Sequence, residues 1–180
     1  MKTSQHAHDH DVVTPNWQRD GCFGCGPANP QGLQLQFALS DGGKSYVCEF
    51  SLGDNFVGPP GHAHGGIIAT ILDEAMGKAN KLRNKIALTR RMQVDYLRPV
   101  PLHQPLVVEG SVLRARGRNL YNRGELRNAK GEVLARGRGM FLTINAEKMF
   151  RRELEAEAKR RRLAAPVGAP NDSEINCDPT

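Results

Sequence analysis

One acidic side chain lies where a helix could present it to a reacting group. From Gly65 to Leu82 the apolar residues recur at helical spacing, and Asp73 falls on the opposite side of the predicted helix. Its neighbours on that side are nearly all small, namely Gly66, Ala69, Thr70 and Gly77. A solvated face would carry Lys, Glu and Gln, so the small residues suggest close approach by another subunit or a ligand. By position alone, Asp73 fits either an ordinary helix acid or a functional acid in a partly desolvated cleft.

Two glycines at the start of the same helix offer a complementary group. Gly65 and Gly66 follow His64, and glycines there let a ligand reach backbone N–H groups that carry partial positive charge. Such groups stabilise the oxyanion that forms when a carbonyl is attacked. Asp73 lies eight residues beyond Gly65, about 12 Å along a helix axis, which is too far for both to hold one carbonyl. If both act on one substrate, they come from two subunits, which predicts an isologous dimer.

The pair Cys22-x-x-Cys25 raises a metal or redox interpretation. A structural zinc site usually has four ligands, often as two such pairs. The other cysteines do not form a second pair, because Cys48 falls in a strand-like run and Cys177 in a predicted loose tail. Redox pairs of this spacing normally open a helix, whereas glycines and Pro27 surround this one. We therefore expect no metal site and no cofactor.

Length and charge fit one soluble domain with two tails. The 180 residues suffice for a real core, and no apolar run approaches the roughly 20 residues that cross a bilayer. Residues 1–15 are polar and His-rich, so we expect no secretory signal and a cytoplasmic location. Half of the net charge of +6 lies in residues 151–163. We interpret that run as a solvated helix and expect neither nucleic acid nor membrane as a partner, since no aromatic residues interleave with it.

Strand-like segments precede and follow the helix. Residues 33–39 alternate apolar and polar side chains, and residues 45–52 place Tyr46, Cys48 and Phe50 on one face. Four more strands are predicted at residues 86–96, 105–115, 120–128 and 133–144. The short breaks between them imply antiparallel pairing. Helix formers are frequent in residues 147–163, which predicts a terminal helix, whereas residues 1–20 and 164–180 should be flexible.

The central helix has an apolar stripe that must be buried. The stripe consists of Ile67, Ile68, Ile71, Leu72, Ala75, Met76 and Ala79. A single apolar helix and a long antiparallel sheet pack economically when the sheet wraps the helix. We therefore predict an α+β fold in which a curved antiparallel sheet of five to six strands wraps a long central helix, with a C-terminal helix added.

Four segments follow one another in an order that is specific as a set. The run His64-Gly65-Gly66-Ile67-Ile68-Ala69-Thr70-Ile71-Leu72-Asp73 matches the pattern H-G-G-x-x-A-T-x-x-D. Residues 22–33 match C-F-G-C-G-x-x-N-P-x-G-L, residues 89–99 match T-x-x-x-x-V-x-Y-x-R-P, and Gly117-Arg118 matches a G-R turn. Together they resemble the hotdog-fold acyl-CoA thioesterases, most closely the PaaI-like and thioesterase-superfamily-member branch. The resemblance implies a hotdog domain over residues 21–146, between an arm of residues 1–20 and a basic helix and tail of residues 147–180.

The resemblance also implies roles for individual residues. Asp73 matches the catalytic carboxylate, acting as nucleophile or as general base on water, and Gly65 matches the glycine whose N–H polarises the thioester carbonyl. His64 matches the histidine that positions the thioester, and Thr89 the hydroxyl residue that holds the attacking water. The expected substrate-binding residues are Gly66, Asn55, Asp95, Leu97, Arg98, Arg118, Asn119 and Arg123. The implied partners are acyl-CoA and further copies of the chain, as a homodimer that pairs into a dimer of dimers.

The chain departs from the family at one segment. Relatives often have Asn-Tyr-Lys-Arg-Pro where this chain has Asp95-Tyr96-Leu97-Arg98-Pro99, so a lysine that could meet CoA phosphates is missing. Candidates to replace it are Arg90, Arg91, Arg98 and Arg118.

Other functions also fit parts of the sequence. A non-catalytic acyl-CoA-binding module on the same fold would need the helix but not Asp73. A hotdog hydratase or dehydratase would pair Asp and His in a different motif, which the sequence lacks. A nucleic-acid or membrane contact through residues 151–162 is the third alternative.

Overall fold

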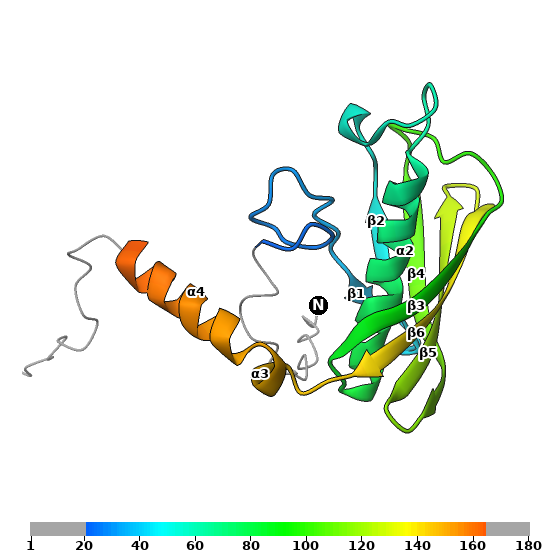
Figure 1. Cartoon of the computed structure of the whole chain (residues 1–180). Coiled ribbons are helices and arrows are strands. Elements are labelled where there is room, and N and C mark those ends of the chain that lie inside the picture. Colours follow the sequence, from blue (N-terminus) through cyan, green and yellow to red (C-terminus); the bar gives the residue numbers. More distant parts are fainter. Residues whose placement is uncertain (1–20, 165–180) are drawn as a thin grey trace, which may run out of the picture. The chain divides into compact units, whose positions relative to one another are not determined.

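Six antiparallel strands and one long helix dominate residues 21–164, the part of the chain that the computed structural model describes. The strands lie in the order β1-β2-β4-β5-β6-β3. Their bounds are β1 (Ala38–Leu39), β2 (Ser45–Phe50), β3 (Ala87–Tyr96), β4 (Leu106–Arg116), β5 (Asn119–Asn128) and β6 (Val133–Thr143). The long helix α2 (Gly65–Ala79) packs against β2 through β6, and Figure 1 shows it lying along the curved sheet. The predicted fold, a long central helix wrapped by an antiparallel sheet, is confirmed.

The helix comes close to the sheet because glycines leave room for it. Gly110 on β4, Gly124 on β5 and Gly137 on β6 are direct cross-strand neighbours, and we call these three residues the glycine row. A Cβ added at Gly110 would overlap the Ala75 carbonyl of α2, and one at Gly137 would lie only 3.0 Å from Met76 Cε. A side chain at Gly110 would therefore push the helix away from the strands, whereas one at Gly124 or Gly137 would first displace the Leu72 and Met76 side chains.

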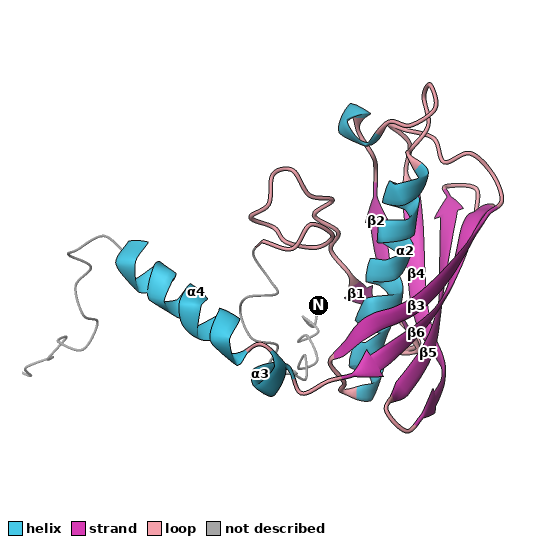
Figure 2. Cartoon of the chain, in the orientation of Figure 1, coloured by secondary structure: helices cyan, strands magenta, loops and turns pink. Residues whose placement is uncertain are grey.

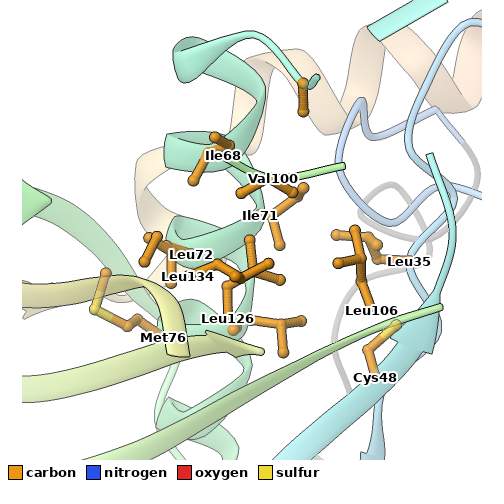
Figure 3. Packing of buried hydrophobic residues seen from close by; sticks show 14 of the residues in the cluster. Leu35, Cys48, Ile68, Ile71, Leu72, Met76, Val100, Leu106, Leu126 and Leu134 are labelled. Atoms are coloured by element: carbon orange, nitrogen blue, oxygen red, sulfur yellow. The ribbon is translucent and has the colours of Figure 1, made fainter. Parts of the chain in front are cut away.

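The apolar stripe of α2 is buried, as predicted. Its buried members are Ile68, Ile71, Leu72, Ala75, Met76 and Ala79, while Ile67 is partly buried and packs on the same cluster. Figure 3 shows Ile68, Ile71, Leu72 and Met76 of the helix in one cluster with Leu126 and Leu134 from the sheet. Because burying one large aliphatic side chain contributes roughly 1.5–3 kcal/mol, this contact supplies much of the stability of the domain.

The end of the helix is fixed by buried polar contacts. The α-helix stops at Ala79, three residues before the predicted end, and a 3-10 helix η2 (Asn80–Arg83) follows. Asn122 of β5 donates hydrogen bonds of 2.7 Å to the Met76 carbonyl and to Asn80 Oδ1. Both asparagines are buried, so these bonds offset part of their desolvation and tie the helix end to β5.

The predicted strand at residues 33–39 is wrong over most of its length. Only Ala38–Leu39 pairs with β2. Gln34 adopts a positive φ of 49°, and the Leu35 N–H bonds to the Gly24 carbonyl at 3.0 Å. The segment therefore packs with its own preceding loop. Leu35 is 2% exposed and Leu39 is 53% exposed, so the alternation in sequence did not correspond to one buried face.

Beyond Asn145 a second compact unit begins at Ala146. The helix predicted for residues 147–163 is divided into α3 (Ala146–Met149) and α4 (Arg151–Ala164), both cyan in Figure 2. The described side chains of α4 are exposed or partly exposed, as expected for a solvated helix. The flexibility predicted for residues 1–20 and 165–180 falls outside the described residues. Within the described part, no helix is both long and apolar enough to span a bilayer, and the cytoplasmic location stays a prediction.

The glycine row can be tested by substitution. Replacing Gly110 by Ala should lower the free energy of unfolding by about 1–3 kcal/mol, the usual cost of over-packing, because the new Cβ meets a carbonyl that moves only with the helix. Gly42→Ala is the matched control, since a Cβ there meets nothing within 4 Å. Urea unfolding of both variants measures the difference, and equal midpoints would contradict the role given to the row.

Candidate active site

Asp73 and Thr89, both predicted to be catalytic, meet in the structure. Asp73 lies on α2 and Thr89 on β3, the strand at one end of the sheet. The Thr89 hydroxyl donates a hydrogen bond of 2.7 Å to Asp73 Oδ1. A β-bulge between Thr89 and Arg91 distorts the strand at this point, and such bulges re-aim side chains. Thr89 therefore holds the carboxylate directly, in addition to any water it was predicted to hold.

The surroundings of Asp73 make its carboxylate more basic. Burial raises the pKa of Asp73 above its usual 3.8, the Thr89 hydrogen bond lowers it, and the nearby charge of Glu74 raises it again. The desolvation dominates, so the net pKa shift is upward. A carboxylate that has lost part of its hydration accepts a proton more readily than one in bulk water.

At the start of α2, three of the first four N–H groups have hydrogen-bond partners. His64 Nδ1 accepts from the Gly66 N–H at 3.0 Å, and the His64 carbonyl accepts from Ile67 at 3.0 Å and Ile68 at 3.2 Å. Among the described residues, the Gly65 N–H has no such partner. This is the amide that the sequence predicted as the oxyanion donor, and the helix dipole adds partial positive charge to it.

Tyr96 belongs to the same end of the site, although no role was predicted for it. Its hydroxyl donates to the Gly65 carbonyl at 3.1 Å, and its ring lies 3.7 Å from where a Cβ on Gly65 would be. Tyr96 thus helps to orient the peptide at the helix start. An aromatic hydroxyl at the end of a predicted strand was the signal in the sequence. Its partner, a backbone carbonyl 31 residues earlier, could not be read from sequence.

The cap also fixes how His64 can act. Because Nδ1 accepts the Gly66 N–H, a neutral His64 must hold its proton on Nε2. The ring is exposed, so the Nε2–H can donate to a ligand that reaches the helix start. This placement is compatible with the predicted positioning role.

One chain does not bring the two halves of the site together. Gly65 and Asp73 are separated by two helical turns, about 12 Å. The residues of β3 that contact them, Tyr96 and Thr89, are seven positions apart on the strand, about 23 Å. The separation argued from the sequence therefore holds in the folded chain.

Several predicted substrate-binding residues lie near the helix start, together with Gly66. These are Asn55, Asp95, Leu97 and Arg98. Asn55 is exposed on the 3-10 helix η1 (Asp54–Phe56), and the Phe56 carbonyl accepts from the His64 N–H at 2.9 Å. The other three are exposed and flank Tyr96 or follow it closely.

Two of the remaining predicted residues, Arg118 and Asn119, lie toward the opposite end of β3. Arg118 donates through Nε and Nη2 to the Thr143 carbonyl, at 3.3 and 3.1 Å. Thr143 pairs with Ala87, the first residue of β3. Asn119 begins β5 beside Arg118, and Arg123 lies farther along β5 with a 3.1 Å bond to Ser111 Oγ. Arg118 and Asn119 lie at the Thr89 end, whereas Arg123 pairs with Arg138, the partner of Gln93 near the middle of β3. A single chain therefore spreads the predicted set along β3.

A separate cluster could hold a metal ion. Cys22, Cys25 and Glu74 place their ligand atoms within 4.8 Å of one another. The sequence predicted no metal site, because only the cysteine pair was visible there. Glu74 joins the pair through the folding of the loop onto α2.

Comparison with known proteins gives these residues a family context. The thioesterase superfamily matches residues 60–135, a range that includes Gly65, Asp73 and Thr89. The acyl-coenzyme A thioesterase THEM4 of Xenopus laevis is 32% identical over 123 residues, which are 68% of this chain and 51% of that protein. The chain spans about half the length of the curated relatives it matches.

Solved structures agree with the sequence match. Protein RHA08564, a thioesterase superfamily protein, is 32% identical, with a TM-score of 0.62 over 74% of this chain and 63% of that chain. The E. coli PaaI protein is 19% identical, with a TM-score of 0.57 over 63% of this chain and 81% of that chain. At 19% identity the likeness shows the shared fold alone. The resemblance to the hotdog-fold thioesterases is confirmed.

The Thr89 hydrogen bond should be measurable in the titration of Asp73. Thr89→Val should raise the pKa of Asp73 further, because the hydroxyl stabilises the ionised carboxylate. Thr70→Val is the control, since the Thr70 hydroxyl bonds the Gly66 carbonyl at 3.0 Å instead. Carbon-13 NMR of the Asp73 carboxyl group would report both values. A fall in the pKa of the Thr89 variant would refute the assignment.

The ionised Asp73 side chain should also lower the free energy of unfolding at neutral pH. Its pKa in the folded chain lies above 3.8, so the folded state binds more protons than the unfolded state between these two values. The free energy of unfolding of the parent should therefore fall as the pH rises from about 4 through the folded pKa. Asp73→Asn has no carboxylate to titrate, so the stability of the variant minus that of the parent should increase from pH 4 to 7 in thermal unfolding. A decrease in this difference over the interval would contradict the raised pKa.

Proposed function

We propose, from the premise that this chain belongs to the thioesterase superfamily, that it hydrolyses acyl-CoA thioesters to a carboxylic acid and CoA. The observation that carries the proposal is the half-buried Asp73 carboxylate held by Thr89 at 2.7 Å. Its raised pKa makes the carboxylate a stronger base toward water. The naming of the Xenopus laevis relative as an acyl-coenzyme A thioesterase supports the same substrate class.

Asp73 either activates the attacking water or attacks the thioester itself. As a general base, it takes a proton from water while the water oxygen attacks the thioester carbonyl carbon. The carbon–sulfur bond then breaks, and the CoA thiolate leaves and is protonated. As a nucleophile, Asp73 would itself bond to the carbonyl carbon and expel the CoA thiolate, and water would then hydrolyse the resulting anhydride to the free acid and the Asp73 carboxylate. Thr89 orients the carboxylate in either route.

The Gly65 N–H stabilises the oxygen of the attacked carbonyl. It has no partner among the described residues and lies at the positive end of the α2 dipole. Negative charge grows on the carbonyl oxygen as the tetrahedral intermediate forms, so this donor acts most strongly in the transition state. Tyr96 and His64 position the peptide at the helix start, and exposed arginines such as Arg98 and Arg118 meet the CoA portion.

Two subunits are needed for one site. Gly65 and Asp73 are about 12 Å apart along one helix, and a thioester carbonyl cannot touch both. The proposed homodimer supplies Gly65 from one copy and Asp73 from the other, by a two-fold relation. Its formation is favoured by β3, a ten-residue strand at the end of the sheet that leaves backbone groups open for pairing.

Loss of the Asp73 carboxylate should stop turnover. Asp73→Asn should lower kcat by about 10²–10⁴, the usual contribution of a general base, for acyl-CoAs of short, long and aromatic type. Release of free CoA thiol measures the rate, and light scattering confirms that the dimer persists. Parent activity should fall as the pH drops through the raised pKa of Asp73, because the protonated acid cannot accept a proton.

Asp41→Asn is the control for this experiment, since Asp41 lies exposed in the turn between β1 and β2. Acyl-CoA binding without hydrolysis by the parent, unchanged in Asp73→Asn, would instead indicate a non-catalytic binding module.

The Gly65 N–H can be removed by proline. Proline is well tolerated at the first helical position, and His64 already has the extended backbone that precedes proline, at φ −65° and ψ 139°. Gly65→Pro should lower kcat by about 10²–10³. Gly65→Ala keeps the N–H, and its Cβ would lie 3.7 Å from the Tyr96 ring, an ordinary contact. The alanine variant should therefore lose much less activity than the proline variant.

Mixing two inactive variants tests the shared site. A heterodimer of Gly65→Pro and Asp73→Asn has one site with both lesions and one with neither, if each site draws on two subunits. Refolding the variants together should therefore restore about a quarter of parent activity for random pairing. If both residues of a site came from one chain, every site would contain a lesion and activity would not return.

A further inference from the structure

The loop that precedes β1, drawn in blue in Figure 1, holds two thiols against α2. Cys22 and Cys25 are partly buried, and the Gly26 N–H closes the turn on the Cys22 carbonyl at 2.9 Å. Gly24, between them, has no room for a side chain, because a Cβ would overlap the side chain of Glu74. Contact between loop and helix is therefore tight at this point.

The loop is also fixed from its other end. The Leu33 N–H bonds to the Phe23 carbonyl at 2.8 Å, and the Leu35 N–H bonds to the Gly24 carbonyl at 3.0 Å. Leu35 itself is 2% exposed and belongs to the hydrophobic core. The two thiols thus sit on a turn that backbone bonds and core packing hold in one place.

The spacing of the three ligand atoms suits a tetrahedral cation. Cys22 Sγ lies 3.6 Å from Glu74 Oε1, and all three ligand atoms lie within 4.8 Å of one another. Zinc bonds of about 2.3 Å to sulfur and 2.1 Å to oxygen place a sulfur and an oxygen ligand about 3.6 Å apart. The same geometry separates two sulfurs by about 3.8 Å. Small side-chain adjustments would bring the cluster to this geometry.

The charges around the cluster favour a dication. Lys78 Nζ donates to Cys25 Sγ at 3.1 Å, one turn along α2 from Glu74. Two thiolates, one carboxylate and one ammonium group add to −2, so a dication makes the site neutral. Burial raises the pKa of the Cys25 thiol to about 12, with a further contribution from Glu74. A bound metal ion deprotonates a coordinating thiol outright.

We propose that Cys22, Cys25 and Glu74 bind a divalent cation of the zinc class, with water as the fourth ligand. Binding displaces the two thiol protons to solvent. The ion joins the turn at residues 22–25 to the helix turn that also contains Asp73. Its role is structural, because none of its ligands belongs to the proposed acyl-CoA site.

A redox-active disulfide explains the cluster less well. A disulfide between Cys22 and Cys25 would be neutral. It would therefore offer no positive charge to the Glu74 carboxylate that lies beside Cys22 Sγ. The carboxylate beside the thiols favours a metal site and disfavours thiol oxidation.

Cobalt titration of the reduced full-length protein tests the proposal. Cobalt(II) should give a thiolate-to-metal charge-transfer band and the intense visible bands of a tetrahedral site, saturating at about one ion per chain, and zinc should bleach them. Histidines near the N-terminus, such as His6, His8 and His10, give no thiolate band when they bind cobalt. The readout therefore separates this cluster from weak histidine binding.

Variants assign the ligands. Cys22→Ser and Cys25→Ser should abolish the charge-transfer band. Loss of an outer-shell partner weakens metal affinity by at least roughly 10-fold. Glu74→Gln removes a direct ligand, so it should weaken zinc affinity by more than this. Cys48→Ala, which removes a thiol buried in the core, should leave the band intact, and circular dichroism verifies that each variant folds.

A measurement on the parent avoids dependence on folded variants. Zinc should protect Cys22 and Cys25 from alkylation, as mapped by mass spectrometry, and a chelator should remove the protection. Absence of a thiolate band in the parent would overturn the proposal. So would a band that survives Cys22→Ser, or a Cys22–Cys25 disulfide that forms equally fast with and without zinc. None of these readouts depends on thioester hydrolysis.

Discussion

The close contact between α2 and the glycine row is the constraint on which the rest of the domain depends. Three neighbouring strands lack a side chain at adjacent positions, Gly110, Gly124 and Gly137, and the Ala75–Met76 turn of the helix fills that space. Both the distance and the rotation of the helix are set there, because its large apolar residues fit only with one face toward the sheet. Every functional position on α2 follows from that rotation.

The rotation decides how much water Asp73 loses. Leu72 is fully buried, and the next residue points about 100° away around the axis, where β3 passes close enough for the Thr89 hydroxyl to bond it. The carboxylate is therefore half desolvated and held by one neutral donor, with no cation among the causes of its pKa shift. This environment raises basicity without neutralising the group. An ion pair at the same position would have lowered the pKa and weakened a general base.

Local patterns predicted what depends on local spacing. The central helix and the four strands after it follow from periodicity, and the proposed catalytic roles of Asp73 and Gly65 come from one contiguous motif. Contacts set by register could not be predicted, because the glycine row, the Tyr96 bond to Gly65 and the approach of Glu74 to the cysteines join residues 13 to 52 positions apart. The error at residues 33–37 has the same origin. Alternation there suggested a strand, but backbone bonds to the loop at Phe23 and Gly24 competed successfully for the same N–H groups.

Three successive residues on one helical turn face three different surroundings. Leu72 faces the core, Asp73 faces β3, and Glu74 faces the cysteine turn. A small rotation of α2 would disturb all three contacts together, so their energies add in resisting it. The glycine row restrains the helix from the sheet side, and a cation held by Glu74 would restrain it from the loop side. Asp73, between these two restraints, can then keep a fixed orientation although only one hydrogen bond in the described chain holds its carboxylate. A single hydrogen-bond donor suits a general base, since each further donor to the carboxylate would lower its pKa.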